Sequence, residues 1–224
     1  MVEHIKAHAK LNLYLGMHGK RADGFHELST LLHEIDLADE LEIAESDQRG
    51  ESEEDRLEVD DPEIPADKNN LVMKTLSLLR GEGFKFPALS IKLSKRIPAG
   101  GGLGGGSADA MAVLKYVATK YMNCPAPEVA SNFAELSARI GSDTTFFLSG
   151  GSAWCTGRGE LVQPQKHHHF YFNLILPPYA CATPVVYAAV QADVDRVEKS
   201  VSSNWLKNWD KGEVVCPQNS LETA

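Results

Sequence analysis

A run of glycines between a strand and a helix limits the possible folds more than any other feature of this sequence. Residues 98–108 read PAGGGLGGGSA and contain six glycines. Before the run, residues 89–93 alternate apolar and polar side chains, which predicts a half-buried strand. After it, apolar residues recur at helical spacing from Met111 to Tyr121. The sequence therefore predicts a strand, a glycine loop and a helix in direct succession.

This unit has the features of a phosphate-binding site. Without a Cβ, a glycine adopts positive φ angles and lets its amide approach a ligand closely. The helix that we expect to begin near Ser107 adds unpaired N–H groups and the positive end of its dipole. A flexible linker is the alternative, but linkers are polar and lack such flanking elements. The pattern therefore favours a loop that binds phosphate groups.

Two better-known glycine loops do not match this one. No lysine follows Gly106, so the Walker A pattern fails. Gly100, Gly102 and Gly105 do satisfy the G-x-G-x-x-G spacing of dinucleotide-binding folds. However, residues 125–141 predict a second helix where such a fold needs its next strand. A P-loop and a Rossmann fold are therefore both disfavoured.

A loop that holds a nucleotide triphosphate implies phosphoryl transfer or hydrolysis. That chemistry needs a cation to spread the developing charge and a group to accept or orient the proton of the nucleophile. The alternation in residues 9–15 predicts a strand with Lys10 and Asn12 on the same face. Asp143 precedes an apolar run, where an isolated Asp is more often a cap than a base. In the context of the glycine loop, Lys10 and Asp143 are the available catalytic pair.

Composition limits the partners and the compartment. The net charge of -9 disfavours binding to nucleic acid, which needs a basic surface. No uncharged apolar run approaches the ~18 residues of a membrane helix, and Lys6 and Lys10 interrupt the start of the chain where a secretory signal needs apolar residues. The four cysteines form no C-x-x-C pair, which disfavours a zinc site or a disulfide framework. We expect a cytoplasmic protein with no membrane or nucleic-acid partner.

Three other segments have ordinary structural interpretations. Residues 45–63 contain ten carboxylates, and we interpret them as a solvated excursion because the fixed spacing of a calcium loop is absent. Residues 167–169 are three consecutive histidines, which cannot share one face of a strand, so a solvated loop is favoured over a metal site. Residues 69–83 predict an amphipathic helix that ends at glycine.

Four ordered motifs give the chain a close resemblance to the GHMP kinases, the family of galactokinase, homoserine kinase and mevalonate kinase. The motifs are AKLNLYL (9–15), GKRADGFHEL (19–28), KRIPAGGGLGGGSADA (95–110) and GSDTTFFLSGG (141–151), with weaker similarity in residues 181–190 and 219–222. The resemblance implies an α+β GHMP kinase fold. It implies an ATP-binding domain like the second domain of ribosomal protein S5 over residues 1–163, followed by an incomplete ferredoxin-like domain over residues 164–224.

The resemblance also implies an activity. It points to ATP-dependent phosphorylation of an alcohol group, assisted by Mg²⁺, on a small molecule that carries a cytidine diphosphate, in the non-mevalonate route to isoprenoids. Asp143 would accept the proton of the substrate hydroxyl group. Lys10 would stabilise Asp143 and the moving phosphoryl group, and Asn12 would orient the substrate.

The implied binding residues fall into two groups. For the substrate, His26 would hydrogen-bond the cytosine and Phe25 would stack on it, although the family usually has tyrosine at the position of Phe25. Thr183 would contact the substrate, and Tyr187 would complete an aromatic sandwich. The residues implied for ATP are Asn70, Lys95, Pro98, Ala99, Gly100, Gly101, Gly102, Leu103, Gly104, Gly105, Gly106, Ser107 and Ala108. No metal ligand is identified.

Some alternatives stay open at the level of sequence. A homoserine- or mevalonate-type GHMP kinase is one, although GFHEL and Tyr187 favour a substrate with a base to stack. A catalytically inactive nucleotide-binding protein is another, because the family's third glycine motif is not found. The sequence represents either a truncated enzyme or a natural short form. We expect a monomer or a weak homodimer.

Overall fold

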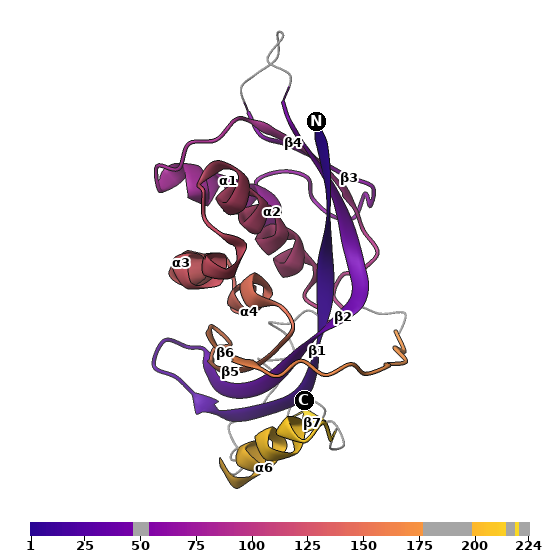
Figure 1. The fold of residues 1–224 in the computed structure, drawn as a ribbon, viewed down its shortest axis with the longest axis vertical. Helices are drawn as coiled ribbons and strands as arrows, with labels where there is room; N and C mark the ends of the chain where they lie inside the picture. Colours follow the sequence, from indigo (N-terminus) through magenta and orange to yellow (C-terminus); the bar gives the residue numbers. More distant parts are fainter. Residues whose placement is uncertain (47–53, 177–198, 214–217, 220–224) are drawn as a thin grey trace. The chain divides into compact units, whose positions relative to one another are not determined.

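The structure is a computed structural model that describes residues 1–46, 54–176, 199–213 and 218–219. Strands and helices are mixed along the chain (Figure 1), which confirms the α+β prediction. The elements are β1 (Val2–Lys20), β2 (His26–Glu45), β3 (Arg56–Val59), α1 (Leu71–Gly81), β4 (Leu89–Ser94), α2 (Gly105–Tyr121), α3 (Ala126–Ala138), α4 (Thr144–Ser149), β5 (Ser152–Gly157), β6 (Leu161–Gln165), α6 (Lys199–Asp210) and β7 (Gln218–Asn219).

The chain divides into two compact units that do not follow a single cut along the sequence. Unit 1 comprises Met1–Ala9, Ile35–Pro98 and Gly104–Leu148. Unit 2 comprises Lys10–Glu34, Ala99–Leu103 and Ser149–Ala224. The long strands β1 and β2 therefore contribute residues to both units. The sequence-based division after residue 163 stays a prediction.

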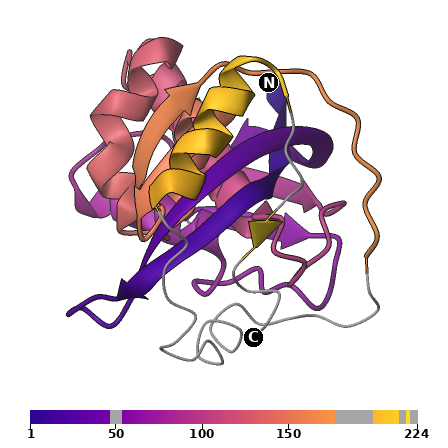
Figure 2. The same cartoon turned by 90° about the horizontal axis from the view of Figure 1, so that it is seen from below.

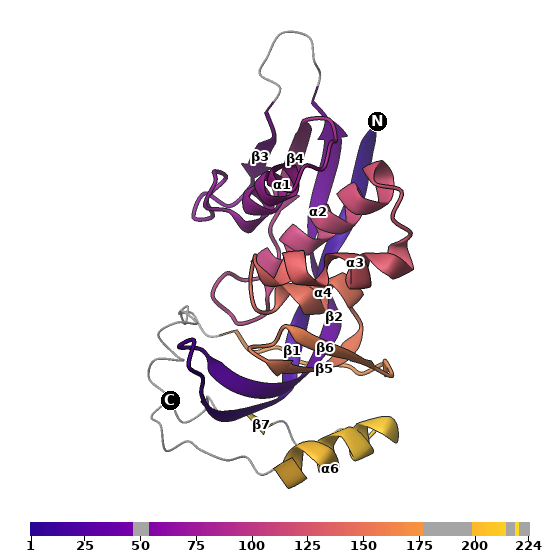
Figure 3. The ribbon, with the colours of Figure 1, turned by 90° about the vertical axis from the view of Figure 1, so that its left-hand side faces the viewer.

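Unit 1 is a sheet covered by helices. The C-terminal part of β2 pairs with β4 in antiparallel fashion, from Glu40 opposite Ser94 to Glu45 opposite Leu89, and β3 adds to β4 in parallel. Helices α1 and α2 lie against this sheet (Figure 3), and α2 contacts α3 as well. Because α2 lies between these elements, almost every residue from Ala108 to Ala118 is buried.

Unit 2 has its own strand pairs and its own aromatic core. The N-terminal part of β2 pairs with β5, β5 pairs with β6, and β1 pairs with β7. Helix α6 packs on these strands (Figure 2). The core cluster is Leu13, Tyr14, Leu31, Trp154, Trp205 and Trp209. The rings of Tyr14 and Trp154 stack with their centroids 5.3 Å apart.

One of the ordinary interpretations needs correction, and a second gains detail. Part of the acidic stretch is structured: residues 56–59 form β3, and Asp55 forms a half-buried ion pair with Arg80, with 2.8 Å between Oδ1 and Nη2. The three histidines lie in a segment without helix or strand, as predicted, and His167 and His169 are exposed. His167 stacks on buried His33 at 4.7 Å, and His168 contacts the edge of Trp209.

The helices predicted from sequence are confirmed. Asn70 caps α1 by accepting a hydrogen bond from the amide of Val72, and the helix ends at Gly81 as expected. Helix α2 begins at Gly105, two residues before the predicted start, and α3 occupies the second predicted helical stretch. Within the described ranges, the chain has no helix with the length and apolar character needed to span a bilayer.

Candidate active site

Lys10 is held in unit 2 by its own strand and by the glycine loop. The side chains of Lys10 and Asn12 lie on the same face of β1, as the alternation predicted, and Lys10 Nζ donates to Asn12 Oδ1 at 2.5 Å. Lys10 Nζ also donates to the carbonyl oxygen of Gly102 at 2.7 Å. The Lys10 amide donates to the carbonyl of Leu103 at 3.0 Å. Lys10 is 4% exposed, so these acceptors hold a buried ammonium beside the loop.

Asn12 is positioned in turn by Thr30 of β2. The Asn12 Nδ2 group donates to Thr30 Oγ1 at 2.9 Å, and this hydroxyl donates to the carbonyl of Tyr14 at 2.6 Å. Each group in the series therefore has a defined donor or acceptor role. The amide of Asn12 presents its oxygen to Lys10 because its nitrogen is engaged by Thr30.

The glycine loop adopts the backbone that its composition predicted. Gly100, Gly102 and Gly104 have φ angles of 71°, 70° and 77°, which an L-residue with a Cβ rarely adopts. Gly104 is the N-cap of α2 and, having no side chain, makes no side-chain cap. Among the described residues, none accepts a hydrogen bond from the amides between Gly102 and Ser107. These N–H groups are available to an anion at the positive end of the helix dipole.

Asp143 lies in unit 1, in the bend just before α4. Thr144 fixes this bend, because its hydroxyl group lies 2.6 Å from the carbonyl oxygens of both Ser137 and Gly141. The following residues of α4 are buried. Asp143 is therefore a half-buried carboxylate on a rigid turn rather than on a mobile loop. Because Lys10 belongs to unit 2, pairing of the two remains a prediction.

The residues implied for the cytosine lie at the start of β2 in unit 2. The Phe25 side chain is 48% exposed, and His26 is half-buried. The guanidinium carbon of Arg158 lies 4.6 Å from the centroid of the Phe25 ring. The sequence interpretation missed Arg158, since only the flanking Gly157 and Gly159 marked that turn. Thr183 and Tyr187 lie outside the described residues.

Asn70 and Lys95, both implied for the adenine, have structural partners in unit 1. Asn70 caps α1, and its Nδ2 donates to the carbonyl of Pro65 at 2.8 Å. Lys95 Nζ forms ion pairs with Asp39 and with Asp109, the latter at 2.8 Å. Their contact with adenine stays a prediction. Asp39 and Asp109 were missed by the sequence interpretation, because the pairing joins residues far apart in the chain.

The burial of these groups changes their acidity. Desolvation raises the pKa of Asp109 to about 7, although the Lys95 ammonium opposes this, and the nearby Asp39 carboxylate raises it further. The pKa of Lys95 is also raised, because the attraction of the two carboxylates outweighs its desolvation.

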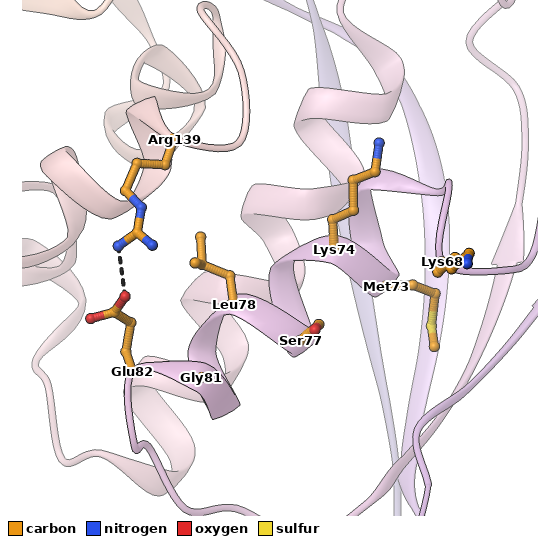
Figure 4. Close-up of a pocket in the computed structure, with 8 residues that line it drawn as sticks. All are labelled: Lys68, Met73, Lys74, Ser77, Leu78, Gly81, Glu82 and Arg139. Carbon is orange, nitrogen blue, oxygen red and sulfur yellow. Dashed lines mark hydrogen bonds and ion pairs between the residues drawn. The ribbon is translucent and has the colours of Figure 1, made fainter.

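A surface pocket of about 470 Å³ lies elsewhere in unit 1, along the outer side of α1 (Figure 4). Arg139 closes one end by donating to Glu82 at 2.6 Å. The lining residues are Lys68, Met73, Lys74, Ser77, Leu78, Gly81, Glu82 and Arg139. None of them belongs to the candidate site.

Comparison with known proteins identifies the family. The model of the GHMP kinases N terminal domain matches residues 70–151. A protein of Pelotomaculum thermopropionicum named 4-diphosphocytidyl-2-C-methyl-D-erythritol kinase is 34% identical over 220 residues, which are 96% of this chain and 74% of that protein. The chain belongs to the GHMP kinase family. This GHMP kinase chain is also 38% identical over 187 residues to the chloroplastic protein of the same name from Oryza sativa subsp. japonica.

The family assignment agrees with the fold. The crystal structure of a 4-(cytidine 5'-diphospho)-2C-methyl-D-erythritol kinase superimposes with a TM-score of 0.71 and 32% identity, covering 99% of this GHMP kinase chain and 76% of that one. The match to the rice protein covers 82% of this chain but only 45% of the rice protein. The chain thus spans about half the length of its plant relatives.

Proposed function

We propose that this chain transfers the γ-phosphoryl group of ATP to the 2-hydroxyl group of 4-diphosphocytidyl-2-C-methyl-D-erythritol, a step of the non-mevalonate route to isoprenoids. The observation that carries the proposal is the row of open amides from Gly102 to Ser107. The loop also has the buried Lys10 ammonium at the carbonyl oxygen of Gly102. The names of the relatives suggest the substrate. Both features support a kinase of small molecules.

The proposed reaction requires three groups of this chain. The substrate hydroxyl oxygen forms a bond to the γ-phosphorus, the bond from that phosphorus to the bridging oxygen breaks, and ADP leaves. Asp143 accepts the hydroxyl proton. The Lys10 ammonium stabilises the charge on the transferring group. Asn12 orients the substrate and fixes Lys10 through their 2.5 Å hydrogen bond.

The proposed ligand contacts involve both units. Residues 98–108, which contribute to both, surround the phosphates, and Asn70 and Lys95 lie near the adenine. In unit 2, the exposed ring of Phe25 offers a face for stacking on the cytosine, and His26 reads its edge. The Arg158 guanidinium now over Phe25 has to be displaced, or to share that ring, when a base stacks.

Mg²⁺ is proposed to arrive with ATP. The described ranges contain no group of three or more His, Cys, Asp or Glu side chains that could hold a metal ion. Mg²⁺ usually keeps several waters and is bound largely through the substrate phosphates in kinases. The proposed roles of Lys10 and Asp143 do not depend on a protein ligand to the metal.

The compartment and the assembly are also proposals. Cys124 is a buried free thiol, which suits a reducing compartment such as the cytoplasm. The rice relative is named as chloroplastic, so a plastid is the other setting to examine. We propose a monomer or a weak homodimer with no nucleic-acid or membrane partner.

The test is a coupled assay of ADP release with ATP and the cytidylylated substrate. We expect Asp143→Asn to lower kcat by about 10² to 10⁴-fold, the usual contribution of a general base. Asp36→Asn, which changes an exposed carboxylate of unit 1, serves as the matched control and should retain full activity. Equal rates for wild type and Asp143→Asn would remove Asp143 from the mechanism.

The same assay separates the alternatives. Cytidine nucleotides should compete with the substrate if the aromatic site binds cytosine. A kinase of homoserine or mevalonate would ignore them and would turn over those alcohols instead. ATP binding without turnover of any of these alcohols would indicate a nucleotide-binding protein without kinase activity.

A further inference from the structure

Three charged side chains meet in the core of unit 1, and none of them takes part in the proposed phosphoryl transfer. Asp39 comes from β2, Lys95 follows β4, and Asp109 is in the second turn of α2. Asp39 is 0% exposed and Asp109 is 2% exposed. We call these three residues the buried triad. Burying a charge destabilises the fold unless the charge is paired. Three buried charged groups in one cluster therefore call for a functional explanation.

The two carboxylates of the triad are not equivalent. Asp39 accepts from Lys95 Nζ and from the backbone amides of Arg96 and Ile97, at 2.5 and 2.8 Å. Asp109 accepts from Lys95 through Oδ2, while its buried Oδ1 has no hydrogen-bond partner. Three donors therefore fix Asp39 as the carboxylate partner of Lys95. Asp109 is the member on which a proton would be held, and the Asp39 carboxylate is close enough to accept a hydrogen bond from it.

Within the part of the chain that the structure describes, the Lys95 ammonium is the compensating charge beside Asp109. Lys95 and Asp39 are the charged groups that act on it. Helices α1 and α3 both contact α2. The buried residues of α1 are Val72, Thr75, Leu76 and Leu79, and those of α3 are Val129, Phe133 and Ser137. None of these residues carries a charge. When Asp109 is ionised, the triad therefore holds two negative charges against one positive charge.

The triad is in contact with the start of the glycine-loop helix. A Cβ on Gly105 would lie 3.2 Å from Lys95 Nζ and 3.1 Å from Ile97 Cγ2. The backbone of Gly105 thus rests directly on the ammonium that Asp39 and Asp109 hold. Asp109 is one helical turn after Gly105. The triad therefore holds the first turn of α2 in place. The amides that we assign to phosphate binding belong to the same turn.

We propose that Asp109 is a positioning residue, which supports the phosphate-binding turn of α2 only while it carries a proton. In this state the triad is neutral and holds Lys95 against Gly105. Loss of the proton leaves an uncompensated negative charge behind amides that must attract phosphate, and nucleotide binding weakens. The proposal rests on the proposed function, because it assumes that these amides bind the phosphates of ATP.

The test measures the dissociation constant of Mg²⁺-free ADP by titration calorimetry between pH 6 and pH 8.5, so no turnover is required. If the ionised form does not bind, a pKa near 7 predicts affinity about tenfold weaker at pH 8 than at pH 6. Asp109→Asn, neutral and of the same shape, should keep the low-pH affinity across the whole range. Any pH dependence that remains in Asp109→Asn reports the titration of ADP itself. Asp36→Asn, the matched control, should follow the wild type.

The outcomes separate this inference from the proposed function. Affinity that is independent of pH in the wild type would overturn the role of Asp109 while leaving the kinase proposal intact. Parallel pH profiles for wild type and Asp109→Asn would overturn it as well. If no nucleotide binds at any pH, the phosphate-binding loop itself is wrong. The wild-type profile decides the question even if the variant is poorly folded, which circular dichroism would reveal.

Discussion

Replacing Asn12 by alanine tests how the catalytic ammonium is held. The variant removes the acceptor of the 2.5 Å hydrogen bond from Lys10 Nζ and leaves the bond to Gly102 in place. A hydrogen bond to a charged group contributes about 1.5–3 kcal/mol. Asn12 is only half-buried, so water replaces part of the loss. We expect the free energy of unfolding to fall by about 1–2 kcal/mol.

The effect on turnover follows from the same bond. If Lys10 is fixed in the transition state by Asn12, a loss of about 1.4–2 kcal/mol corresponds to a fall in kcat of roughly 10- to 30-fold. The assay is steady-state ADP release at saturating substrates, with urea unfolding of the same samples. Thr30→Val is the matched comparison, because it removes the hydroxyl behind Asn12 but keeps the Lys10 acceptor. Thr30→Val should lose less than Asn12→Ala, because the Asn12 oxygen is still present although Thr30 no longer orients it. A full kcat in Asn12→Ala would refute this reasoning.

Two further predictions concern stability. Burial and the neighbouring histidines lower the pKa of His33 to about 4, below its unfolded value. The neutral His33 side chain therefore stabilises the fold fully above about pH 6.5, and this stabilisation is lost as the pH falls towards 4. His33→Gln should move the acid midpoint of tryptophan fluorescence to lower pH, and an unchanged midpoint would contradict the assignment. Arg80→Lys replaces the bidentate hydrogen bonds to Asp55, both 2.8 Å long, by a single ammonium group. The free energy of unfolding in urea should fall by about 1–2 kcal/mol. An unchanged midpoint would show that the bidentate contact is not required.

Local patterns predicted the parts of the site that depend on neighbours in sequence. The period of two placed Lys10 and Asn12 on one face, and their hydrogen bond confirms it. The glycines and the helical spacing that follows located the start of α2 to within two residues. In both cases the relevant physical chemistry acts over a few residues.

Contacts between distant segments were not predicted, because one sequence carries no record of which segments pair. Lys95 meets Asp39 across 56 positions, and nothing in either local pattern links them. The alternation of polar and apolar residues in 56–58 was a weak sequence signal for strand β3, in which Leu57 is buried between exposed Arg56 and Glu58. The surrounding acidic charge nevertheless suggested a solvated loop. Helix α6 had no specific prediction, and its Trp205 and Trp209, which are four residues apart, are both buried.

The most direct test of the account is whether the loop amides bind the phosphates. Backbone amide NMR shifts of ¹⁵N-labelled protein should be recorded with a non-hydrolysable ATP analogue, with ADP and with adenosine. Open amides at the start of α2 predict that both nucleotides shift the signals of residues 102–107, and that adenosine leaves them nearly unchanged. Nucleotide binding that leaves these signals in place, or equal shifts with adenosine, would contradict the assignment of this loop to phosphate.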